Sequence, residues 1–237
     1  TLARLRKYVL RAKVQLEPGA DRLVPYLLDA EAAAALSKSI PESAAADPAG
    51  APAATAPPPF GARAHIECDG VSLIDWPSAE APRMLLLAPA EYSRQTDAAR
   101  CEAWRRADIR AGLPQVYAAT HETFIAPMLN LDLLGGVSYE KGCYTGQEII
   151  ARMHFRGSVK RRMFRFRSPW PAPAPGTRVL AGDTHAGEVV DSATIDGGCE
   201  VLAVISLAQL DAPLRLESDP RATLTRLELP YTVPTGT

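Results

Sequence analysis

Apolar and polar residues alternate along six short runs in residues 158–237. A two-residue period is typical of strands that bury one face, and the Pro, Gly and Asp residues between the runs favour turns. Six strands at such short spacing predict a small antiparallel β-barrel or sandwich. The runs are VKRRMFRFR, TRVLAG, HAGEVVDSA, CEVLAVIS, PLRLES and ATLTRLEL.

The preceding part, residues 1–157, mixes helical and strand patterns and predicts an α+β region. Helices are predicted for residues 2–10, 30–36, 89–112 and 147–155. Strands are predicted for residues 12–16, near Val116 and in the runs ARAHIEC, VSLIDW and RMLLLA. Asp69-Gly70 separates two of these runs and favours a hairpin turn.

One segment of this region has no such pattern. Ala and Pro fill 14 of the 19 positions of residues 41–59, a composition that cannot bury a core. We therefore predict a disordered insertion there. The change of pattern near Gly157 predicts a domain boundary between residues 1–157 and 158–237.

Composition and charge exclude several classes of protein. A net charge of −1 excludes a globally basic nucleic-acid binder, and no apolar stretch is long enough to span a membrane. The four cysteines lie far apart, which argues against a disulfide framework or a zinc site and predicts no metal ligands. Free thiols indicate a reducing compartment, so we expect a cytoplasmic protein.

Residues 141–148 read KGCYTGQE and lead into the helix predicted at 147–155. Thr145 and Glu148 have the spacing of a capping box, in which each side chain binds a backbone N–H of the first turn. Glu148 and Arg152 are spaced i, i+4 in the order that favours an ion pair. Helix stability thus explains the second half of this segment without any chemistry.

The first half of the segment has no such explanation. Cys143 lies just before the predicted helix, where the helix dipole and Lys141 favour a thiolate, and Gly142 allows a tight turn. We therefore interpret Cys143 as a candidate nucleophile and the other three cysteines as small buried apolar residues. A Cys–His dyad with His121 or His154 stays open, because sequence alone marks neither histidine.

Two further features have both a structural and a functional interpretation. Residues 151–167 carry seven Arg or Lys and no acid. This run is either a solvated strand face, with Phe164 and Phe166 inward and Arg165 and Arg167 outward, or an anion site for RNA phosphates over residues 152–167. Trp104 lies in a predicted helix, where it is either part of a core or a stacking partner for a flat heterocycle.

The run from Trp104 to Gly157 closely resembles the YgfZ family of folate-binding proteins, relatives of the glycine cleavage T-protein, an aminomethyltransferase. The family hallmark is K-G-C-[FY]-x-G-Q-E, and residues 141–148 match it throughout. Supporting matches are AGLP at 111–114, NLD at 130–132, GG at 135–136, AR at 151–152, RG at 156–157 and LPY at 229–231.

The resemblance implies a folate-binding, T-protein-like α+β region followed by a C-terminal barrel. It also implies tetrahydrofolate or a related folate as cofactor, and iron–sulfur proteins such as tRNA methylthiotransferases as partners. It assigns the functional role to Cys143, within a motif of Lys141, Gly142, Tyr144, Gly146, Gln147, Glu148 and Arg152. Folate contacts are expected from Trp104, Arg110 and Asn130.

This chain also differs from both families at positions that matter for function. The N-terminal segment that helps form the family's folate pocket is expected to be missing from this chain. T-proteins carry an acid where this chain has Cys143 and an arginine where it has Gln147, which argues against aminomethyl transfer. The expected function is thus support of iron–sulfur protein assembly or repair and of tRNA methylthiolation. The alternatives are an aminomethyltransferase-like enzyme and a non-catalytic RNA or protein adaptor.

Overall fold

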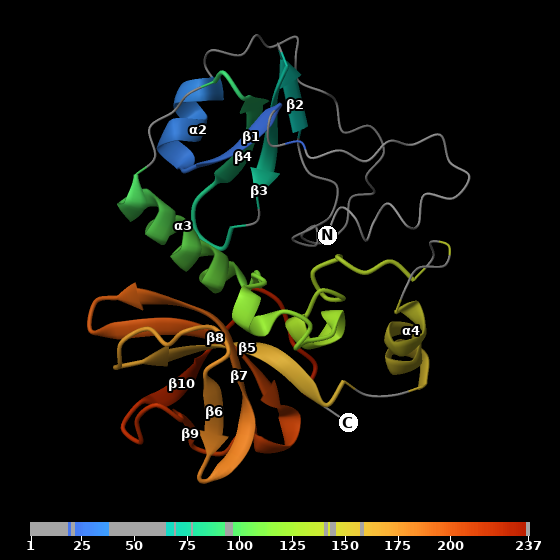
Figure 1. The fold of residues 1–237 in the computed structure, drawn as a ribbon, viewed down its shortest axis with the longest axis vertical. Helices are drawn as coiled ribbons and strands as arrows, with labels where there is room; N and C mark the ends of the chain where they lie inside the picture. The colour runs from blue at the N-terminus through green and yellow to red at the C-terminus, as the bar shows by residue number, and fades with distance from the viewer. Residues whose placement is uncertain are drawn as a thin grey trace.

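The fold places a small sheet and a barrel on either side of one helix, α3 (Ala98–Ala111) (Figure 1). The computed structural model describes residues 19, 22–37, 65–68, 70–76, 78–92, 97–139, 142, 146–156 and 159–235. The elements predicted at 2–10 and 12–16, the insertion at 41–59 and the boundary residue Gly157 lie outside the described residues.

The sheet is antiparallel, with the strand order β1-β4-β3-β2. Its strands are β1 (Leu23–Leu28), β2 (His65–Cys68), β3 (Val71–Trp76) and β4 (Arg83–Pro89). Helix α2 (Ala30–Ser37), confirmed by the structure, packs on one face and encloses a core of Leu28, Leu73, Leu86 and Ala88. The predicted hairpin is also confirmed, since β2 pairs with β3 and Gly70 has a φ of 75°.

The pattern did not predict β1, because Pro25 interrupts its apolar run. Within the described sheet β1 is an edge strand that pairs with β4 alone. An edge strand tolerates proline, which has no backbone N–H to donate, because one side of the strand forms no ladder hydrogen bonds. Pro25 is thus compatible with a strand because β1 lies at the edge of the sheet, a position that no local pattern indicates.

Helix α3 is shorter than predicted, because β4 continues through Pro89 and the helix begins only at Ala98. Its N-terminus is set by Asp97, whose side chain accepts a hydrogen bond from the backbone N–H of Ala99 at 2.8 Å. The predicted end is confirmed: Gly112 takes the left-handed conformation, with φ at 67°.

The strand predicted near Val116 is wrong. Residues 113–117 form no regular element and are followed by two short 3-10 helices, η2 (Ala118–Thr120) and η3 (Ala126–Leu129). Val116 is 67% exposed, so its side chain has no buried sheet face to occupy. High strand propensity of Val and Tyr does not form a strand where no neighbouring strand pairs with it.

The C-terminal barrel is confirmed as a closed antiparallel barrel with the order β10-β5-β8-β7-β6-β9. All six predicted runs form its strands: β5 (Arg161–Ser168), β6 (Arg178–Ala181), β7 (Thr184–Ile195), β8 (Gly198–Ser206), β9 (Leu214–Leu216) and β10 (Thr223–Leu227). Phe164 and Phe166 point into its core, as predicted. Gly187 permits close packing of β7 on β8, because a Cβ there would lie 1.9 Å from the carbonyl oxygen of Val204.

Candidate functional site

The helix predicted after the KGCYTGQE segment is confirmed as α4 (Gln147–Arg156), which Figure 1 shows beside the barrel, away from the sheet. Gly146 directly precedes it with a φ of 88°, a conformation that side chains other than glycine rarely adopt. Lys141, Cys143, Tyr144 and Thr145 lie outside the described residues. The role of the middle of the motif therefore stays a prediction.

The described motif residues lie at the surface around the first turn of α4. Gly142, Gly146 and Glu148 are exposed, and Gln147 is half-buried. Glu148 forms the predicted ion pair with Arg152 at 3.1 Å. Both side chains are largely exposed, so this pair contributes little to stability. The N-terminus of an α-helix such as α4 concentrates partial positive charge.

The other described cysteines differ from one another. Cys199 lies buried in the barrel core, as predicted, and burial raises the pKa of its thiol to about 11. Cys101 is exposed on α3, so the prediction of a buried apolar residue is wrong there. The side chain of Cys68 lies outside the described part of the chain. At neutral pH the Cys199 thiol thus stays protonated and unreactive.

Trp104 lies on the face of α3 that packs against the sheet and is 7% exposed. The guanidinium of Arg83 stacks over its ring, with 4.3 Å between the guanidinium carbon and the ring centroid. The Trp76 ring lies beside it, at 6.4 Å between centroids. Trp104 is therefore a core residue of the interface between sheet and helix.

Arg83 is also one partner of a buried ion pair beside these two tryptophan rings. Arg83 contacts Asp108 at 3.0 Å, and both side chains are 5% exposed. Trp76 donates its indole N–H to the same Asp108 oxygen at 3.2 Å, and Arg83 donates to the carbonyl oxygen of Trp104 at 3.1 Å. Burial raises the pKa of Asp108 and lowers that of Arg83, although each charge stabilises the other. Desolvation thus outweighs the attraction between them.

Trp104 also lines a small cavity between α3, the start of α2 and the loop before β4. Its volume is about 180 Å³. Pockets for drug-sized ligands measure roughly 300–1,000 Å³, so this one has room for a ring but not for a whole folate. The lining residues are Leu27, Asp29, Ala30, Ser78, Glu80, Ala81, Pro82, Arg83, Arg100, Ala103, Trp104 and Ala107.

Arg110 is engaged by carboxylates from two parts of the fold. It pairs with Glu80, in the loop before β4, at 2.9 Å and with the buried Glu200 of β8 at 3.0 Å. Glu200 also binds Arg165 of β5 at 2.7 Å. Arg110 does not line the cavity beside Trp104, and its contacts link the sheet region to the barrel.

Asn130 is completely buried and has a left-handed backbone, with φ at 58°. Its side-chain amide donates to the carbonyl oxygen of Met163 on β5 at 2.8 Å and to the hydroxyl of Tyr231 at 3.5 Å. Tyr231 in turn donates to the carbonyl oxygen of Gly112 at 2.8 Å, and burial raises the pKa of Tyr231 to about 12. The structure therefore separates Asn130 from the cavity that Trp104 lines.

A further buried carboxylate, Asp191 on β7, is not indicated by any pattern in the sequence. It lies where the register of β7 with β8 shifts, and its side chain is fully buried. Arg105 of α3 donates to it at 2.9 Å, and the Tyr117 ring lies 5.5 Å from the Arg105 guanidinium carbon. Burial, followed by the Asp191 charge, raises the pKa of Tyr117 to about 12. Asp191 and Arg105 come together only because α3 packs against β7.

The basic run contains fewer free charges than its sequence suggests. Arg161 pairs with Glu188 at 2.8 Å, and Arg165 pairs with Glu200. Arg162 is buried and pairs with Asp132 at 2.7 Å, so a fully solvated strand face is wrong at this position. These acids come from elements far away in sequence, and they neutralise three of the arginines proposed to contact RNA.

The described ranges show the features of neither a metal site nor a membrane-spanning helix. They contain no group of three or more His, Cys, Asp or Glu side chains arranged to hold a metal ion. No helix within these ranges has both the length and the apolar character that crossing a bilayer requires.

Comparison with known proteins shows a curated relative that matches most of the chain. The chain is 30% identical over 243 residues to the tRNA-modifying protein YgfZ of Edwardsiella ictaluri (strain 93-146). The match covers 96% of this chain and 69% of that relative. No protein-family model matches the chain.

The buried pair Arg83–Asp108 gives a stability prediction. Arg83→Met leaves Asp108 buried without its cation and should cost about 3–5 kcal/mol in the free energy of unfolding at pH 8. The cost should shrink at pH 5, because burial raises the pKa of Asp108 and protonation removes its uncompensated charge. Urea unfolding at both pH values measures this difference.

The double variant Arg83→Met/Asp108→Leu serves as the control for this prediction. It removes both charges and should be more stable than Arg83→Met alone. Additive losses from the two substitutions would show that the pair does not act as a unit.

Proposed function

Because the chain belongs to the YgfZ family, we propose that it is a cytoplasmic accessory protein of tRNA modification that acts through Cys143. The observation that carries this proposal is the intact segment KGCYTGQE at residues 141–148, directly ahead of α4. The relative's name, tRNA-modifying protein, supports the part of the proposal that concerns tRNA.

In this proposal the reactive group is the Cys143 thiolate. The first turn of α4 and Lys141 favour the ionised thiol, because positive charge near a cysteine lowers its pKa. Gly146, directly before α4, takes a φ of 88°, a conformation that residues other than glycine rarely adopt. The partners are iron–sulfur proteins, above all tRNA methylthiotransferases, whose clusters the protein helps to assemble or repair. This partner class comes from the family resemblance.

The test uses cells in which the endogenous gene is deleted and replaced by a variant. Cys143→Ala should reduce methylthiolated nucleosides in tRNA to the level of the deletion strain, measured by mass spectrometry of tRNA hydrolysates. Cys101→Ala is the matched control, since it removes an exposed thiol elsewhere on the molecule. Wild-type methylthiolation with Cys143→Ala would refute the role of this cysteine.

Folate is the second part of the proposal, and the cavity beside Trp104 is its candidate site. The part of the Trp104 ring that lines the cavity offers an apolar surface for a flat heterocycle. Arg100 at the cavity wall already pairs with Asp29 at 3.1 Å, so an anionic substituent of the ligand would have to compete with that carboxylate. The volume of about 180 Å³ accepts only a ring-sized part of a folate. Arg110 and Asn130, also expected to contact folate, do not line this cavity, so we assign the folate contact to Trp104 alone among the three.

Filling the cavity tests this assignment. Ala107 lines the cavity on α3, and Ala107→Leu places a larger side chain there without loss of helix propensity. Affinity for tetrahydrofolate, measured by calorimetry, should fall at least about tenfold, which corresponds to roughly 1.4 kcal/mol. Ala98→Leu, at the exposed start of α3, is the control and should bind as the parent does. Equal affinity of all three proteins would place folate elsewhere.

A further inference from the structure

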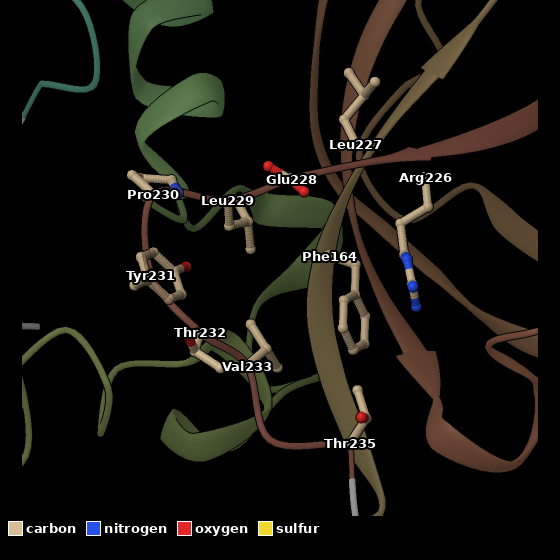
Figure 2. A pocket seen from close by; sticks show the side chains of 10 residues that line it. All are labelled: Phe164, Arg226, Leu227, Glu228, Leu229, Pro230, Tyr231, Thr232, Val233 and Thr235. Atoms are coloured by element: carbon tan, nitrogen blue, oxygen red, sulfur yellow. The ribbon is translucent and has the colours of Figure 1, made fainter.

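An open groove lies where the C-terminal tail leaves the barrel (Figure 2). Its volume is about 710 Å³, within the roughly 300–1,000 Å³ typical of ligand sites. The lining residues are Phe164, Arg226, Leu227, Glu228, Leu229, Pro230, Tyr231, Thr232, Val233 and Thr235. Neither the KGCYTGQE segment nor the cavity beside Trp104 contributes to it.

The groove exists because β10 pairs with only part of β5. The two strands match over Arg165, Phe166 and Arg167, and the tail then diverges from the first half of β5. The Tyr231 hydroxyl anchors the diverging tail to the end of α3, while Val233 packs against the barrel core. The tail beside the groove is therefore attached to the fold at two points, through the half-buried side chains of Tyr231 and Val233.

Among the described residues, Arg226 is the one cation that lines this groove. It pairs in register with Phe166, so alternation directs its side chain to the same face as the barrel core residues. Figure 2 shows it extending alongside the Phe164 ring, away from Glu228. Arg226 is exposed and forms no ion pair with any described residue.

The lack of a carboxylate distinguishes Arg226 from most arginines of the barrel. Six others each bind an acid: Arg161, Arg162, Arg165, Arg178, Arg215 and Arg221. The remaining one, Arg167, donates to the backbone carbonyl oxygen of Asp196 and does not line the groove. A single unneutralised guanidinium in a groove is suited to an anion that comes from outside the protein.

We propose that this groove binds a single-stranded segment of RNA, with a phosphate on Arg226. This inference rests on the proposed function, because a protein that acts in tRNA modification meets tRNA loops. The Thr232 and Thr235 hydroxyls supply hydrogen bonds to sugar or phosphate oxygens along the same groove. The openness of the groove to solvent along the tail suits a polymer that passes through it.

The test measures binding of the full chain to a fluorescein-labelled anticodon stem-loop RNA by fluorescence anisotropy. Arg226→Gln should weaken binding about tenfold at low salt and reduce the salt slope by about 1, as expected for one lost phosphate contact. Arg221→Gln is the matched control: it removes the same charge from an exposed arginine of the barrel, one already paired with Asp219. It should stay within about twofold of the parent.

Three results would overturn the inference. They are equal weakening by both variants, absence of RNA binding by the parent, and displacement of the RNA by low concentrations of inorganic phosphate, which would indicate a small-anion site. Cys143→Ala should bind the RNA as tightly as the parent. If Cys143→Ala abolishes methylthiolation in cells while Arg226→Gln leaves RNA affinity unchanged, the groove inference fails and the proposed function stands.

Discussion

The arrangement of this protein depends on charged contacts made by both faces of α3. Toward the sheet, Asp108 pairs with Arg83 in a buried site beneath Trp104. Toward the barrel, Arg105 binds the buried Asp191 on β7, and Ile109 joins an apolar cluster with barrel residues. A buried charge is costly without its partner, so these pairs favour one specific docking of the helix over other apolar packings.

Local patterns predicted the elements that local physics determines. The six barrel strands, the hairpin at Gly70 and the helix after Gly146 follow from alternation, turn residues and helix periodicity. The misses involve long-range pairing: β1 depends on its place at the sheet edge, and Val116 has strand propensity but no partner strand. For the same reason the sequence could not indicate Asp191, or predict that distant acids neutralise the basic run.

This neutralisation changes how the charge of the protein relates to its function. The basic run contains a high density of arginines, yet their charges largely serve to hold β5 to its neighbours. Function is better sought where a reactive or charged group has no structural use. One such candidate within the described residues is Arg226 at the groove, and another in the sequence is Cys143 in the segment that leads into α4.

The central claim is that Cys143 differs chemically from the other cysteines of the chain, and the pH dependence of alkylation measures this most directly. The native protein is treated briefly with iodoacetamide between pH 6 and pH 11, and each cysteine is quantified by mass spectrometry. Cys143 should reach half-maximal reaction below about pH 8.5, the ordinary pKa of a thiol, whereas Cys199, whose pKa is raised to about 11 by burial, should stay unmodified at that pH. A Cys143 thiol that reacts only above its ordinary pKa would contradict the account.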